Sequence, residues 1–141
     1  MKLVVDTNVL FSFFWKNSIS KKLLMNTSIE LFSPEFALEE INKYEEEIII
    51  KTKITKEEFK NLKKELAIII NFVPLEEYKD FFKQAVNICP DTDDADFFAL
   101  ALKFRVHLWS NDSKLKDQEV IKIMTTKDLL NNPDFVDSIF D

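Results

Sequence analysis

Short apolar runs alternate along this chain with longer stretches whose apolar residues recur at helical spacing. The short runs are bounded by turn-forming or charged residues, as expected of buried strands. They predict strands at residues 2–6, 29–33, 72–75, 107–110 and 120–124. The longer stretches predict helices at residues 7–16, 34–50, 55–70, 76–89, 94–104, 111–117 and 126–132.

Several of the predicted helices begin with capping signals. Thr7 follows the first strand and is a candidate N-cap, while Ser33 can cap the next long helix with Pro34 in its first turn. Thr55 and Glu58 have the spacing of a capping box. Because the helices at 34–50 and 55–70 are joined by a short turn, we expect them to form an antiparallel helical hairpin arm.

Strands that alternate with helices indicate a mostly parallel sheet with helices on both faces. The predicted fold class is therefore α/β, a three-layer α/β/α sandwich around about five strands, with the helical arm attached. The sequence contains no repeat, low-complexity segment or Pro/Ser-rich linker, which predicts one domain over residues 1–141. In such sheets the ligand site lies outside the carboxyl ends of the strands, where the strand order reverses.

Composition excludes several classes of function. The 141 residues include no glycine, which excludes the Gly-rich loops that bind dinucleotides or nucleoside triphosphates. The sequence has no paired Cys or His spacing for zinc, and its one histidine, His107, is expected in the core of a strand rather than in a Ser-His-Asp triad. The single Cys89 fits a structural thiol in a reducing cytosol, and no apolar run is long enough to cross a bilayer. We therefore predict a cytoplasmic protein.

The segment "PDTDDADFFALALKF" places four carboxylates, those of Asp91, Asp93, Asp94 and Asp96, within six residues. Such density is costly in a cleft unless a cation or bound protons neutralise it. The predicted topology brings Asp94 to the end of the sheet where Asp6 ends the first strand and Asp112 follows the fourth.

Glu40 lies about two turns into its helix and can reach the same end of the sheet. A cluster of carboxylates at that end would bind a hard divalent cation, Mg²⁺ or Mn²⁺. Each acid also has an ordinary interpretation: Asp94 as a helix cap, Asp112 as a turn residue and Glu40 as a solvated glutamate. Asp6 is the hardest to explain in this way, because it ends a buried strand.

Four phrases in order, "VVDTNVL", "PEFALEEI", "DDADFFALAL" and "LWSND", resemble the PIN-domain family of metal-dependent nucleases over essentially the whole chain. The resemblance implies catalytic and metal-binding roles for Asp6, Glu40, Asp94 and Asp112. It also implies that Asn8 and Ser110 support the cluster.

The sequence departs from the family pattern in two places. Asp91 can substitute for or assist Asp94, while Asp93 and Asp96 are expected to cap a helix or face solvent. Glu39 competes with Glu40, which is preferred because it directly precedes the apolar Ile41.

The resemblance implies an endoribonuclease that uses Mg²⁺ or Mn²⁺ to hydrolyse phosphodiester bonds to 5′-phosphate and 3′-hydroxyl ends. Many free-standing members of the family are toxins with an antitoxin partner, so that role is one candidate. Because the net charge is −6, contacts to RNA must be local. The candidates, which are equally ordinary solvated lysines, are Lys16, Lys21, Lys22, Lys114 and Lys116.

Two alternatives differ from the nuclease in class. One is a PIN-like dimerisation or scaffold module with weak catalysis, and the other is a phosphatase of the haloacid dehalogenase type. The phosphatase is disfavoured because Asn8 stands where that family has a second Asp. We also predict a homodimer through the arm, because Ile48, Ile49, Ile50 and Ile54 gather near its tip.

Overall fold

The computed structural model describes residues 1–26 and 28–133, which leaves the last eight residues of the predicted domain 1–141 outside the description. Within that part, the sheet has five parallel strands in the order β3-β2-β1-β4-β5. Their bounds are β1 Lys2–Val5, β2 Glu30–Pro34, β3 Ile70–Val73, β4 His107–Trp109 and β5 Ile123–Met124. The strand order reverses between β1 and β4, because the chain adds strands first on one side of β1 and then on the other.

Helices occupy most of the chain between the strands. The α-helices are α1 Thr7–Phe11, α2 Ile19–Leu24, α3 Phe36–Lys43, α4 Glu45–Thr52, α5 Lys56–Ile69, α6 Leu75–Tyr78, α7 Phe82–Ile88, α8 Ala95–Phe104 and α9 Thr126–Leu130. Short 3₁₀ turns are η1 Ser12–Phe14, η2 Lys79–Phe81, η3 Thr92–Asp94 and η4 Ser113–Lys116. None of the helices in the described part of the chain is both long and apolar enough to cross a membrane.

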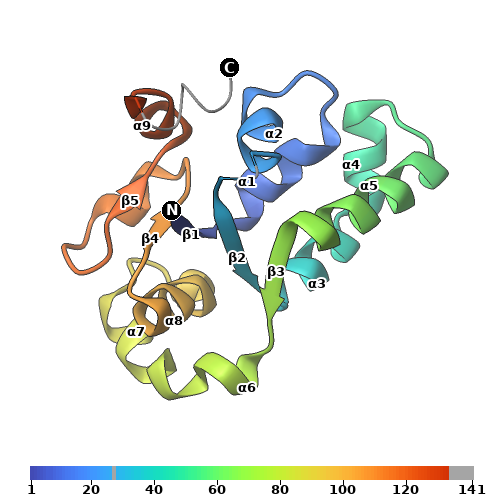
Figure 1. Cartoon of the computed structure of the whole chain (residues 1–141). Coiled ribbons are helices and arrows are strands. Elements are labelled where there is room, and N and C mark those ends of the chain that lie inside the picture. The colour runs from blue at the N-terminus through green and yellow to red at the C-terminus, as the bar shows by residue number, and fades with distance from the viewer. Residues whose placement is uncertain (27, 134–141) are drawn as a thin grey trace.

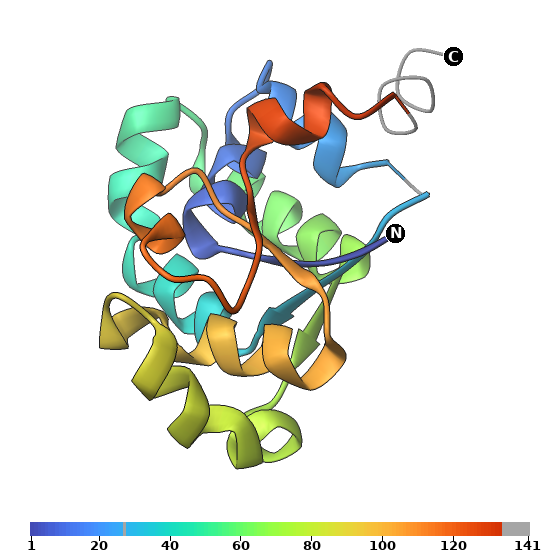
Figure 2. The same ribbon diagram turned by 90° about the vertical axis from the view of Figure 1, so that its left-hand side faces the viewer.

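The helices form two layers with the sheet between them. Helices α6, α7 and α8 cover one face, and α1, α2, α5 and α9 lie on the other (Figures 1 and 2). The middle strand β1 is buried from both sides, with Leu3, Val4 and Val5 fully buried. On the α5 side, the rings of Phe14 and Phe59 stack with centroids 4.9 Å apart. The three-layer α/β/α prediction is therefore confirmed.

Two of the predicted helix caps are wrong and one is confirmed. Asp6, rather than Thr7, is the N-cap of α1. Ser33 pairs with β3 as part of β2 and donates its hydroxyl proton to the carbonyl oxygen of Val5 at 2.9 Å. Ser33 therefore pairs within the sheet and does not cap the helix that follows. The capping box of Thr55 and Glu58 is present at the start of α5.

The expected helix at 34–50 is divided in two at Tyr44. This residue leaves helical geometry (φ −100°, ψ 15°) and its ring meets Phe11 edge-on, with ring centroids 6.0 Å apart. In α4 Ile48 is buried, 7% exposed, while Ile50 is 76% exposed, and Ile54 in the connection to α5 is buried as well, 5% exposed. The prediction that these isoleucines leave apolar surface uncovered at the tip is therefore wrong for most of them, because other residues of the same chain cover their side chains.

The predicted third strand is displaced by two residues and the fifth is shorter than expected. Pro74 has no N–H for the sheet and is the N-cap of α6, so β3 ends at Val73. The predicted helix at 76–89 is interrupted by η2 into α6 and α7. In the fifth strand only Ile123 and Met124 pair with β4.

Single polar residues gave mixed outcomes. The prediction that His107 lies in the core is wrong, because it is exposed at the first position of β4. The strand begins two residues after Arg105, an exposed residue with left-handed backbone (φ 56°). Cys89 is partly buried and packs against the core, as expected of a structural thiol. Asp96 neither caps nor faces open solvent, because it accepts a 2.6 Å hydrogen bond from the buried Tyr78 hydroxyl.

Candidate functional site

Asp6 lies at the point where the strand order reverses. It follows β1 directly, is 6% exposed, and its backbone N–H donates to the carbonyl oxygen of Trp109 at 3.0 Å. Its own carbonyl oxygen accepts a hydrogen bond from the N–H of Val9, in the first turn of α1. Sheet and helix together therefore fix this carboxylate at the carboxyl end of the central strand.

Ser110 connects Asp6 to the end of β4. Its side chain is fully buried, and its hydroxyl donates to the carboxylate of Asp6 at 2.7 Å. The same oxygen accepts from the backbone N–H of Asp112 at 3.1 Å. One hydroxyl therefore orients Asp6 and holds the backbone of Asp112, so Ser110 lies where a supporting residue was predicted.

Glu40 reaches the site from α3 through a residue that the sequence analysis assigned to another role. The Thr7 hydroxyl donates to a Glu40 carboxylate oxygen at 2.7 Å, and Thr7 is buried. Glu39, the competing candidate, is exposed. The one available signal for Thr7 was its position directly after a strand-ending acid, where a helix begins.

Asp94 enters from the acidic turn. It ends η3 and precedes α8. Burial raises its pKa to about 7, assisted by the charges of Asp6, Asp91 and Asp112. Asp91 is exposed and accepts a 3.0 Å hydrogen bond from the backbone N–H of Asp93, which makes it the cap of η3 as well as a neighbouring charge.

The carboxylates influence one another electrostatically. Burial raises the pKa of Asp6, the hydrogen bond from Ser110 opposes that rise, and the charge of Asp112 adds to it. Burial likewise raises the pKa of Glu40, against the hydrogen bond from Thr7 and with a further increase from Asp6. Burial and neighbouring negative charge therefore disfavour the ionised forms of Asp6 and Glu40, while the hydrogen-bond donors Ser110 and Thr7 stabilise them.

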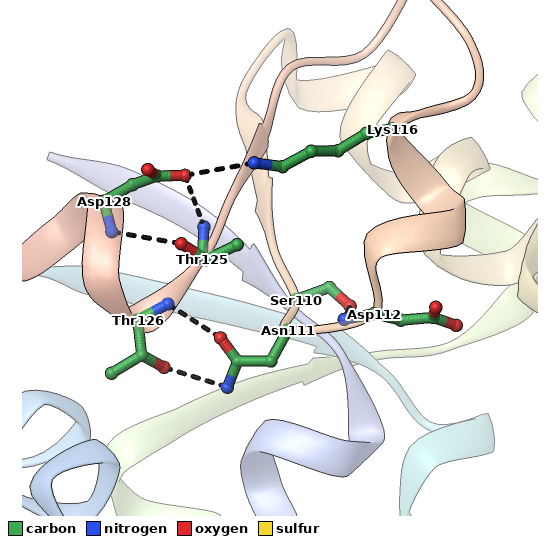
Figure 3. A network of polar contacts seen from close by, with 7 residues as sticks. All are labelled: Ser110, Asn111, Asp112, Lys116, Thr125, Thr126 and Asp128. Atoms are coloured by element: carbon green, nitrogen blue, oxygen red, sulfur yellow. Dashed lines mark hydrogen bonds and ion pairs between the residues drawn. The ribbon is translucent and has the colours of Figure 1, made fainter.

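The loop after β4 is held on its other side by α9. Asn111 accepts from the backbone N–H of Thr126 at 2.8 Å and donates to its hydroxyl at 3.0 Å (Figure 3). The Lys116 ammonium lies 3.6 Å from the Asp128 carboxylate. In Figure 3 the carboxylate of Asp112 points away from Thr126 and Asp128. Neighbouring residues of this loop therefore serve different purposes, Asn111 facing α9 and Asp112 facing outward from that network.

A family model of the PIN domain matches residues 4–131 of the 141 residues. The chain belongs to the PIN-domain family. A search among curated proteins gave no match. PIN domains are generally nucleases, often ribonucleases, and generally use divalent metal ions. The family match supports the nuclease interpretation and gives no support to the phosphatase alternative.

The donor set of this PIN domain fits a hard cation in its chemistry. Asp6, Glu40, Asp94 and Asp112 offer only oxygen ligands, which suit Mg²⁺ or Mn²⁺. In residues 1–26 and 28–133, however, no three His, Cys, Asp or Glu side chains are grouped closely enough to hold a metal ion. The charge of Asp6 raises the pKa of Glu40 and of Asp94, but the acidic side chains are not in a ligating arrangement.

Some candidate cations near the strand ends take part in the fold of this PIN domain. Lys116 pairs with Asp128, and the Lys21 ammonium lies 4.9 Å from the ring centroid of Phe13. Lys114 is exposed two residues after Asp112. Contacts of these lysines with RNA stay predictions.

Proposed function

We propose that this PIN domain is a metal-dependent endoribonuclease that hydrolyses phosphodiester bonds to 5′-phosphate and 3′-hydroxyl ends. The observation that supports the proposal is the electrostatic influence of Asp6 and Asp112, which follow neighbouring strands at the switch point of the sheet, on acids from other segments. The proposed metal-binding and catalytic residues are Asp6, Glu40, Asp94 and Asp112.

The protein's own groups orient this cluster. Ser110 donates a hydrogen bond to one oxygen of Asp6, and Thr7 donates one to a carboxylate oxygen of Glu40. When bound, Mg²⁺ or Mn²⁺ supplies charge neutralisation at the scissile phosphate and a water of lowered pKa. The hydroxyl donors therefore position ligands rather than contact the reacting atoms.

RNA is the proposed substrate because PIN domains are often ribonucleases. Single-stranded segments present a deformable backbone with unstacked bases, which an open site at a sheet end can accept. The acidic character of the chain makes the metal essential for this binding, because the carboxylates alone would repel phosphates.

Cleavage of a generic single-stranded RNA with Mn²⁺, Mg²⁺ or chelator tests the proposal. We expect metal-dependent cleavage by the wild type and its loss in Asp6→Asn. The adjacent pair on α3 gives a matched control: Glu40→Gln removes most activity, whereas Glu39→Gln, at an exposed position on the same helix, keeps it.

Wild-type rates in Asp6→Asn and Glu40→Gln under saturating Mn²⁺ would show that the cluster is not the active site. The absence of metal-dependent cleavage by the wild type would instead favour the scaffold alternative. The observation that favours the scaffold alternative is that no three acidic, His or Cys side chains in the described residues are already arranged to hold a metal ion.

A toxin role, an antitoxin partner and a homodimer stay predictions. The dimer prediction now rests on the exposed isoleucines of the two arm helices. Ile50 of α4 is 76% exposed, and Ile68 of α5 is 86% exposed. Sedimentation equilibrium at micromolar concentration tests the dimer. A mass that falls to the monomer in Ile50→Glu combined with Ile68→Glu supports it, and a purely monomeric wild type contradicts it.

A further inference from the structure

A pocket of about 380 Å³ adjoins the carboxylate site on the side of α1, α3 and α4. Asn8 and Glu40 line it, so the pocket and the acidic site share part of their wall. Its volume lies within the range of small-molecule sites, which is roughly 300–1,000 Å³. A group seated in this pocket would lie directly beside whatever the carboxylates hold.

Aromatic side chains line this pocket. Trp15 and Tyr44 are 45% and 38% exposed, and they are the only exposed Phe, Tyr or Trp side chains in residues 1–26 and 28–133. Phe11, half-buried, supports Tyr44 from the edge. Two exposed rings in a single pocket are unexpected, because the other aromatic rings in residues 1–26 and 28–133 are buried or partly buried and exposure gives up the gain from burial.

The break between α3 and α4 creates this arrangement. A continuous helix through Tyr44 would carry the following residues in a straight line, whereas the break places Tyr44, Ile48 and Lys51 around one hollow. Trp15 enters from the other side, where η1 ends in extended backbone. Two chain irregularities therefore converge on the same pocket.

Cations accompany the rings. Lys51 lines the pocket with an exposed side chain, and its ammonium lies 3.5 Å from the carboxylate of Glu47, which lines the same pocket. The Lys43 ammonium lies 5.5 Å from the centroid of the Tyr44 ring. In a chain of net charge −6, exposed rings with neighbouring lysines form a surface suited to a flat aromatic group attached to a phosphate.

We propose that this pocket binds an unpaired nucleobase of the RNA substrate next to the scissile phosphodiester, by stacking on Trp15 and Tyr44. Lys51 then contacts a phosphate of the same strand. This inference rests on the proposed nuclease function and extends it, because it assigns a base-binding subsite that makes single-stranded RNA the substrate. Stacking on an aromatic ring accepts any base, so the subsite contributes affinity rather than sequence recognition.

Binding of a short oligoribonucleotide tests the subsite apart from cleavage. The titration uses Asp6→Asn protein with Mg²⁺, an RNA hexamer and an abasic hexamer that keeps the same phosphates. Trp15 is exposed while Trp109 is fully buried, so quenching of tryptophan fluorescence by a stacked base reports on Trp15. We expect quenching by the RNA hexamer and little by the abasic one.

Affinity gives the second measurement. Trp15→Ala and Tyr44→Ala should each weaken binding of the RNA hexamer by about 5- to 100-fold, the usual range for a lost stacking ring. Trp15→Phe, which keeps a ring, should restore most of the affinity. Met25→Ala, an exposed apolar position outside the pocket, serves as the control and should change nothing.

The outcomes separate this inference from the proposed function. Equal affinity of the RNA and abasic hexamers, or unchanged binding in both alanine variants with folded melting curves, overturns the base subsite while leaving metal-dependent cleavage untouched. Base-dependent quenching without metal-dependent cleavage by the wild type supports the subsite and overturns the nuclease proposal. An absence of quenching by either hexamer would also overturn the subsite and would favour a protein as the occupant of the pocket.

Discussion

The two sides of the carboxylate site are held in different ways. On the strand side, Asp6, Ser110 and Asp112 follow β1 and β4, and hydrogen bonds of the sheet ends fix their positions. On the helix side, Glu40 depends on the register of α3 and Asp94 on a 3₁₀ turn. A strand end is constrained by its neighbours in the ladder, whereas a helix can rotate or shift as a unit, so we expect the helix side to tolerate change better.

The largest difference between the two sides is expected when their hydroxyl donors, Ser110 on the strand side and Thr7 on the helix side, are removed. Ser110→Ala removes the side-chain donor to Asp6 and the acceptor for the backbone N–H of Asp112, and we expect a loss of about 10- to 100-fold in kcat/KM or in Mn²⁺ affinity. Thr7→Val keeps the shape of a buried side chain but removes one donor to Glu40, so a smaller loss is expected. Kinetics and metal titration of both variants check this order. A larger loss in Thr7→Val than in Ser110→Ala would reverse the comparison.

The same contrast explains how far the sequence alone predicts this site. Asp6 and Asp112 follow from strand patterns, because the carboxyl ends of parallel strands meet at one edge of the sheet whatever the helices do. Asp94 followed from its position at the start of α8. The choice of Glu40 over Glu39 required a helix register, in which one residue turns the side chain by roughly 100°.

Features that depend on packing between distant segments were not predictable. The contact of Thr7 with Glu40 spans 33 residues, and nothing local to Thr7 distinguishes it from a helix cap. The break at Tyr44 coincides with its contact to Phe11 on another helix, and it decides that Ile48 is buried. Local sequence patterns predict the helices and strands. Which residues line the pocket and which lie in the core depends on how those helices and strands pack against one another.

A smaller effect is expected from pH on the metal-free protein, through the helix side. The folded-state pKa of Asp94 is about 7, above its ordinary value of 3.8, so the folded protein holds more protons than the unfolded chain between these values. The free energy of unfolding should therefore fall as pH rises from about 4 to about 7. Asp94→Asn removes this part of the pH dependence and should be more stable than the wild type at pH 8 in chelator.

Urea unfolding at several pH values measures this effect. Asp80→Asn is the control, because Asp80 is exposed and its charge is not among those that raise the pKa of Asp94, so this variant should keep the wild-type slope. A pH dependence that is unchanged in Asp94→Asn would show that Asp94 does not carry the excess proton.

The most direct test of the account is a calorimetric titration of Mn²⁺ into the wild type, Asp6→Asn and Glu39→Gln. If acids from the strand side and the helix side form one metal site, the wild type and Glu39→Gln bind Mn²⁺ with similar affinity. Asp6→Asn should then lose at least about 10-fold, because removing a ligand costs no less than removing its supporting residue. Wild-type protein that takes up no Mn²⁺ at millimolar concentration, or an Asp6→Asn variant that binds it equally well, would contradict the account.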